Sequence, residues 1–117
     1  MNRKLTIVHG QGAGTVYNLD VGEHLIGRKD EVDGFFPEID LQEFDEVAKI
    51  SRKHAKITVT DETAIIEDLD SLNGTYVNQL DQAIQVGSFQ ELKSGDEVNI
   101  GSIVLRLLVD CFCYTNL

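Results

Sequence analysis

The chain has 117 residues, of which 42% are hydrophobic, and its formal net charge is −10. This length suits one domain with a buried core of its own. A strongly acidic chain is repelled by polyanions, so general binding to nucleic acid or to an anionic membrane is not expected. The apolar stretch near the N-terminus ends at His9. It is too short for a signal peptide or a membrane span, so we expect a cytoplasmic protein.

Short segments in which apolar and polar residues alternate run along the chain, as is typical of half-buried strands. Ala55, Ile57 and Val59 alternate with polar neighbours, and the segment from Ile103 to Val109 shows a second such row. In chain order, the candidate strands are 5–8, 15–19, 24–26, 39–41, 55–60, 63–68, 75–77, 97–100 and 103–109. Turn signals rich in Gly, Asn, Asp and Ser separate them. The pattern predicts an all-β sandwich or barrel with very little helix.

The Gly-rich segment 10–14 could be mistaken for a phosphate-binding loop. A dinucleotide fingerprint would place such a loop between a strand and a helix, but strand character resumes at Thr15. A Walker loop is excluded because no Gly-Lys-Ser/Thr sequence follows. We therefore expect a hairpin connection here and no nucleotide cofactor.

Segment 29–50 departs from the strand rhythm because it is rich in Asp and Glu. Its acidic residues do not follow the spacing of an EF-hand calcium loop, since Val32 and Gly34 stand where ligands would be needed after Asp30. We expect a loop that is solvated by its charges and pinned by its aromatic residues, Phe35, Phe36 and Phe44.

Cys111 and Cys113 lie close to the C-terminus. A disulfide between residues at i and i+2 of a strand would be strained, and two cysteines alone do not complete a metal site. We therefore expect one domain over residues 1–110, a C-terminal tail over 111–117, and no metal.

Catalysis finds little support in the sequence. Ser51 and His54 lie three residues apart, but no third group is evident to orient a base, and the surrounding sequence is not that of a nucleophile elbow. The chain is therefore not expected to be an enzyme.

Three short blocks offer a different chemistry. They are Gly27-Arg28, the Ser-Arg-Lys-His-Ala run at 51–55 and the Ser-Leu-Asn-Gly-Thr-Tyr-Val-Asn run at 71–78. Each lies where a candidate strand meets a turn, and together they supply guanidinium, hydroxyl and amide donors suited to an oxyanion. Six of the ten basic residues also fall in one stretch: Arg28, Lys29, Lys49, Arg52, Lys53 and Lys56. A local cationic site on an acidic chain suits a small anionic ligand.

In this order, the three blocks resemble the forkhead-associated (FHA) domain, a module that binds phosphothreonine peptides. The resemblance spans roughly residues 5–108. It implies a monomeric β-sandwich of about eleven short strands, with the ligand loops gathered at one end. The Ser-Leu-Asn-Gly-Thr variant of the third block resembles bacterial members of the family.

The resemblance also implies roles for the matching residues. Arg28 and Ser51 would bind the phosphate, with both side chains largely exposed, and Arg52 would add charge beside it. Asn73 would bond the peptide backbone next to the phosphothreonine. Gly27, His54 and Gly74 match architectural positions, where the imidazole ties two loops together. At position 72, Leu replaces the Thr of many members, so one hydroxyl donor is missing.

The implied partner is a phosphothreonine-containing protein in a Ser/Thr kinase pathway. The alternative is a phosphate-independent interaction module on the same fold.

Overall fold

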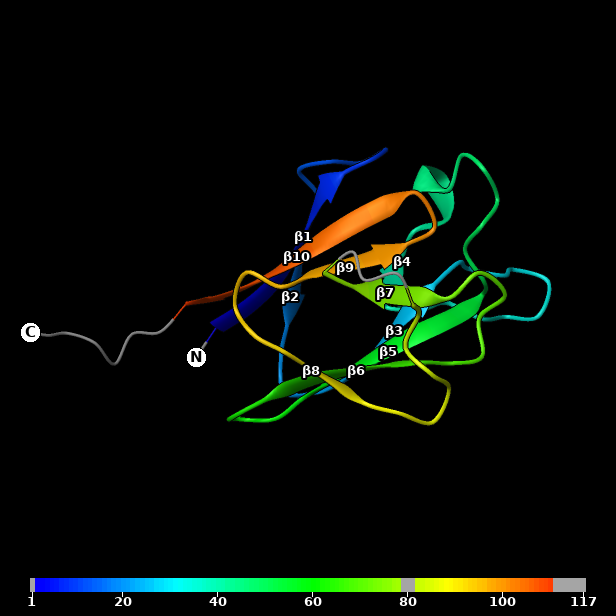
Figure 1. Cartoon of the computed structure of the whole chain (residues 1–117). Coiled ribbons are helices and arrows are strands. Elements are labelled where there is room, and N and C mark those ends of the chain that lie inside the picture. The colour runs from blue at the N-terminus through cyan, green and yellow to red at the C-terminus, as the bar shows by residue number, and fades with distance from the viewer. Residues whose placement is uncertain (1, 79–81, 111–117) are drawn as a thin grey trace, which may run out of the picture.

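The computed structural model describes residues 2–78 and 82–110, which form a two-layered all-β structure (Figure 1). The described residues contain ten strands and one short 3-10 helix, η1 (Gln42–Phe44). The strands are β1 (Asn2–His9), β2 (Val16–Leu19), β3 (Gly22–Gly27), β4 (Ile39–Asp40), β5 (Lys53–Val59), β6 (Ala64–Asp68), β7 (Thr75–Val77), β8 (Gln90–Leu92), β9 (Glu97–Ile100) and β10 (Ile103–Asp110). No helix among these residues has the length and apolar character needed to cross a membrane.

The strands form two five-stranded sheets that pack face to face. One sheet has the order β2-β1-β10-β9-β7 and the other β4-β3-β5-β6-β8. Within both sheets the pairing is antiparallel except between β3 and β4, which run parallel. The prediction of an all-β sandwich is confirmed.

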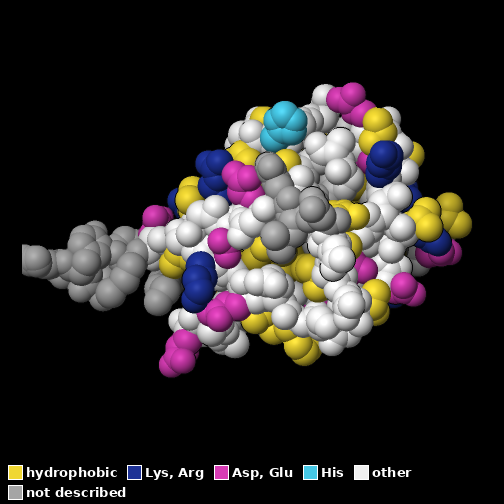
Figure 2. All heavy atoms as spheres, viewed as in Figure 1, with side chains coloured by type: hydrophobic (Ala, Val, Ile, Leu, Met, Phe, Trp, Pro, Cys, Tyr) yellow, Lys and Arg dark blue, Asp and Glu magenta, His cyan; other side chains and the backbone are white. Residues whose placement is uncertain are grey.

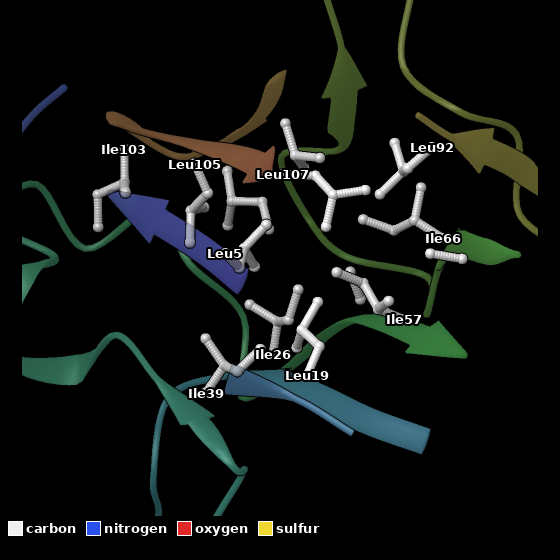
Figure 3. Close-up of a cluster of buried hydrophobic side chains, with 14 of the residues drawn as sticks. Leu5, Leu19, Ile26, Ile39, Ile57, Ile66, Leu92, Ile103, Leu105 and Leu107 are labelled. Carbon is white, nitrogen blue, oxygen red and sulfur yellow. The ribbon is translucent and has the colours of Figure 1, made fainter. Parts of the chain in front are cut away.

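The core lies between the sheets and is built from the alternating apolar residues of the strands. In β5 the side chains of Ala55, Ile57 and Val59 are buried, whereas Lys56 and Thr58 between them are partly exposed. Figure 3 shows the buried side chains from both sheets pointing toward one another. The labelled members are Leu5, Leu19, Ile26, Ile39, Ile57, Ile66, Leu92, Ile103, Leu105 and Leu107. Burial of this apolar surface is the main stabilising contribution to such a fold.

The predicted strands all correspond to observed strands, within one to three residues at their ends. Strand β8 was not predicted because only Leu92 of its three residues is buried. It lies at the edge of its sheet and pairs with β6 alone. The segment at 10–14 is the predicted hairpin connection, in which the Gly14 amide donates to the Ile7 carbonyl at 2.7 Å.

The acidic segment between β3 and β5 is organised differently from the expectation. Phe44 packs against the core and Phe35 is half-buried, but Phe36 is 65% exposed, so its ring does not hold the loop against the core as expected. Pro37 is buried instead. Several of the carboxylates are bonded within the protein rather than only solvated, as described below. Cys111 and Cys113 lie outside the described residues.

Candidate functional site

The three sequence blocks come together at one end of the sandwich. They occupy the end of β3, the segment that leads into β5 and the turn between β6 and β7. Figure 1 shows these segments at the end of the molecule remote from the start of β1 and the end of β10. In the same view, Figure 2 shows cationic and acidic side chains close together at that end.

Gly27 brings the first block against the second. A Cβ atom at this position would lie 1.7 Å from the carbonyl oxygen of Arg52, so only glycine allows the approach. The pairing of β3 with β5 shifts register here, between Ile26 and Gly27. Directly after it, the Arg28 amide donates to the Arg52 carbonyl at 3.1 Å. The backbone of Arg28 is thereby fixed beside the Ser51-Arg52 segment.

His54 ties the second block to the third. Its side chain is fully buried. The Ser51 amide donates to Nδ1 at 3.0 Å, and Nε2 lies 2.8 Å from the Gly74 carbonyl. Because Nδ1 accepts a hydrogen bond, the proton sits on Nε2, which donates to Gly74. Burial lowers the pKa of His54, which keeps the ring neutral in this role.

The third block is a tight turn built around Asp68, which is buried at the end of β6. The Asp68 carboxylate accepts from the Ser71 amide at 2.9 Å, from the Ser71 hydroxyl at 2.5 Å and from the Thr75 hydroxyl at 2.7 Å. The Ser71 hydroxyl in turn accepts from the Gly74 amide at 2.9 Å. Gly74 has a φ of 86°, and a Cβ there would lie 2.9 Å from Ala83. The turn therefore requires glycine at this position.

Arg28 is held in place by the segment before β5. Its Nε donates to the Ile50 carbonyl and lies 3.8 Å from the Asp45 carboxylate, whose side chain is only 2% exposed. Asp45 also accepts from the amides of Lys49 and Ile50, at 2.9 and 3.0 Å. Within the described residues these contacts of Arg28 use Nε, so the two terminal nitrogens of the fork are available to an anion.

Ser51 and Asn73 face each other's segments. The Ser51 hydroxyl oxygen accepts from the Leu72 amide at 3.0 Å, which leaves its own proton for a ligand. The Asn73 side-chain nitrogen donates to the Lys49 carbonyl at 3.0 Å. The side chain of Leu72 is 88% exposed and contributes no polar group.

Arg28 and Ser51 are less exposed than the sequence led us to expect. The Arg28 side chain is 35% exposed and Ser51 is partly buried. Both take part in bonds between loops, so each connects the loops of the site besides facing solvent.

Arg52 points to the acidic segment. Its Nη1 donates to the Asp30 carboxylate and, at 3.0 Å, to the Asp33 carboxylate. The hydrogen bond from Arg52 lowers the pKa of Asp30, and Asp30 raises the pKa of Arg52. The cation that was expected to act beside the phosphate is thus paired in the free protein.

Two supporting residues escaped the sequence analysis. Asp45 and Asp68 orient the groups of the site through side-chain bonds to backbone amides and hydroxyls. For Asp68 the signal was its position just before the turn sequence at 71–74, since Asp side chains often bond nearby backbone amides in turns. Asp45 carried no such signal beyond its place in an acidic loop. Within the described part of the chain, no cluster of His, Cys, Asp and Glu is able to hold a metal ion.

The arrangement offers a guanidinium fork, a hydroxyl proton and a side-chain amide on segments that are hydrogen-bonded to one another, and this suits a tetrahedral oxyanion. Fold and site together define a binding module of the all-β class. The family model of the FHA domain matches residues 24–101, which include all three blocks. The chain therefore belongs to the FHA-domain family.

Similar proteins carry the comparison further. The oxoglutarate dehydrogenase inhibitor of Corynebacterium efficiens is 33% identical over 104 residues, a match that covers 89% of this chain and 63% of that protein. The chain thus spans less than two thirds of this relative. A chain from a structural study of phosphothreonine-dependent FHA domain interactions superposes with a TM-score of 0.76 at 26% identity, covering 96% of this chain and all of that one.

A second similar structure was solved with a ligand. EmbR of Mycobacterium tuberculosis, in complex with a low-affinity phosphopeptide, has a TM-score of 0.73 and 26% identity. That match covers 97% of this chain and 26% of EmbR.

Proposed function

We propose that this chain is a signalling module that binds phosphothreonine peptides made by Ser/Thr kinases, on a partner or on its own parent protein. The observation that carries most weight is the convergence of Arg28, Ser51 and Asn73, on three segments that are hydrogen-bonded to one another, at one end of the sandwich. Similar proteins support the ligand class, since one was studied for phosphothreonine-dependent interactions and another was solved with a phosphopeptide.

Each residue takes the role that its contacts support. The terminal nitrogens of Arg28 and the hydroxyl proton of Ser51 bind phosphate oxygens, with charge-assisted bonds to the guanidinium. Asn73, whose amide nitrogen is bonded to Lys49, presents its side-chain oxygen to a backbone amide of the peptide. Arg52 adds positive charge once it is drawn from its carboxylate partners.

Gly27, His54 and Gly74 serve the site as scaffold. Gly27 and Gly74 allow close approaches that no other residue permits, and His54 bonds the loops on either side of the ligand. Because the ring is buried and both of its nitrogens are occupied within the scaffold, His54 has no part in proton transfer to a ligand. In this function the chain acts as a cytoplasmic monomer, without a cofactor, a catalytic step or nucleic acid.

The test is a titration with two peptides that differ only in phosphorylation of one threonine. The peptide is selected from a phosphothreonine library randomised on both sides of the phosphothreonine. We expect the phosphorylated form alone to bind. Equal binding of both forms would instead support the phosphate-independent interaction module.

The Arg28→Ala variant tests whether Arg28 binds the phosphate. Loss of the charge-assisted bonds should weaken phosphopeptide binding by about 1.5–3 kcal/mol, or roughly 10- to 150-fold. Lys29→Ala is the matched control, because Lys29 is an exposed neighbour that pairs with Glu31 at 3.4 Å. The affinity of the Lys29→Ala variant for the phosphopeptide should change less than about threefold. Circular dichroism checks that Arg28→Ala still folds, since Arg28 also bonds Ile50. A folded Arg28→Ala variant with unchanged affinity would contradict the assignment.

A further inference from the structure

The loop between β3 and β4 holds two carboxylates against a cation of the proposed site. Asp30 and Phe35 pair through their backbones, with amide-to-carbonyl bonds of 2.7 and 2.8 Å, and so close the loop. Inside it, one Asp30 oxygen accepts from the amides of Val32 and Asp33, at 3.1 and 3.2 Å. The other Asp30 oxygen and the Asp33 carboxylate accept hydrogen bonds from the Arg52 guanidinium. The carboxylates are therefore placed by the backbone before any ligand arrives.

The trio of Arg52, Asp30 and Asp33 opposes the binding of an anionic ligand. One guanidinium and two carboxylates carry a net charge of −1, so the intact trio as a whole does not attract a phosphate. Arg52 is nevertheless at the site, because it follows Ser51 directly and its carbonyl is bonded to the Arg28 amide. For Arg52 to serve the phosphate, its bonds to Asp30 and Asp33 must weaken or break.

A pocket next to the trio can take the compensating charge. It has a volume of about 560 Å³ and is lined by Asp30, Asp33, Gly34, Phe35, Arg52 and Lys53. Phe35 provides an aromatic face, over which the Lys53 ammonium already lies at 5.5 Å from the ring centre. When Arg52 turns to a phosphate, the two carboxylates lose their cationic partner. A Lys or Arg side chain of the peptide then replaces Arg52 as that partner. The stem of such a side chain can pack on the apolar ring while its charge meets the carboxylates.

We propose that Asp30 and Asp33 compete with the phosphopeptide for Arg52 and thereby make the site prefer phosphothreonine peptides that carry a Lys or Arg side chain nearby. This inference rests on the proposed function and names the class of peptide that the site selects. It also assigns a role to the acidic segment, which faces the ligand end of the sandwich.

The test uses phosphothreonine peptides that are identical except at one flanking position, which is Lys, Ala or Glu in turn and is scanned along both sides of the phosphothreonine. The key variant is Asp33→Asn, since the 68% exposed Asp33 side chain contacts Arg52 and caps no backbone amide in the described structure. Glu31→Gln is the matched control. It removes one charge from the same loop, at a residue that is 72% exposed and pairs with Lys29 instead.

With wild-type protein, the Lys peptide should bind more tightly than the Ala peptide at one position or more, and the Glu peptide less tightly. Asp33→Asn should raise affinity for the Ala peptide about two- to fivefold, the range that an exposed ion pair commands, and should shrink the preference for Lys. Glu31→Gln should change either quantity less than twofold. In the Arg52→Ala background, Asp33→Asn should no longer raise affinity, because the competed group is gone.

The outcomes separate this inference from the proposed function. Failure of the wild-type protein to distinguish phosphorylated from unphosphorylated peptide would overturn both. Clear phosphate-dependent binding, with Asp33→Asn and Glu31→Gln behaving alike or with no preference for Lys at any position, would overturn the competition alone. The same holds if Asp33→Asn raises affinity equally when Arg52 is alanine.

Discussion

Replacing His54 by alanine should destabilise the domain strongly, because this buried side chain bonds two loops. The change removes the acceptor of the Ser51 amide and the donor to the Gly74 carbonyl, at 3.0 and 2.8 Å. Each buried group left without a partner costs about 1–3 kcal/mol, and the lost ring leaves a cavity besides. We expect a loss of about 2–4 kcal/mol in the free energy of unfolding. That is a large share of the ~5–15 kcal/mol typical of a whole domain.

Urea denaturation measures this loss. With a slope of about 2 kcal/mol per molar urea, a typical value for a small domain, the midpoint should fall by roughly 1–2 M. His9→Ala is the matched control, since His9 is exposed at the end of β1, and it should stay within about 0.5 kcal/mol of wild type. His54→Gln, which retains an amide donor for Gly74, should lie between the two. A His54→Ala protein as stable as His9→Ala would refute the idea that the imidazole supports the loops.

Gly27→Ala should lower the free energy of unfolding by about 1–3 kcal/mol in urea melts, because the new Cβ would lie 1.7 Å from the Arg52 carbonyl oxygen and would force the two blocks apart. If the variant instead melts like the wild type, the contact relaxes without cost and the reasoning is wrong. At His24, burial lowers the pKa, but the bonds to the Asp20 carbonyl and the Glu38 carboxylate outweigh it and raise the pKa above 6.5. The folded protein thus binds this proton more tightly, so the stability from His24 is full below about pH 6.5 and is lost as the pH rises through the raised value. His24→Gln should accordingly cost more stability at pH 6 than at pH 8.5 in paired urea melts, and an equal cost at both would count against a charged His24. Phosphopeptide affinity should fall from about pH 7.5 to 5.5, as the phosphate loses its second charge near pH ~6, and titrations that show no such fall would argue against dianion recognition.

The sequence predicted most of the strands and the residues of the site, but not the contacts that hold the site together. Alternation in segments such as 55–60 predicted the strands, because a half-buried strand must alternate. The two exposed polar residues of β8, Gln90 and Glu91, concealed this strand, since an edge strand needs only one buried residue to hold its place. The family resemblance predicted that Gly27, His54 and Gly74 are architectural, and for Gly74 the Asn-Gly turn dipeptide pointed the same way. The close approach at Gly27 and the two bonds of His54 appear only in three dimensions.

The sequence by itself determined the class of fold, the order of the three blocks and the donor chemistry that they offer, since these depend on local pattern and on residue type. Tertiary structure decided how the carboxylates are used. Asp45 lies under Arg28, and Asp30 and Asp33 occupy Arg52, across separations of 17 to 22 residues along the chain. No local preference encodes such pairs. They arise because the core fixes the end of β3 beside the start of β5, and the segment between these strands must then fold back over the site.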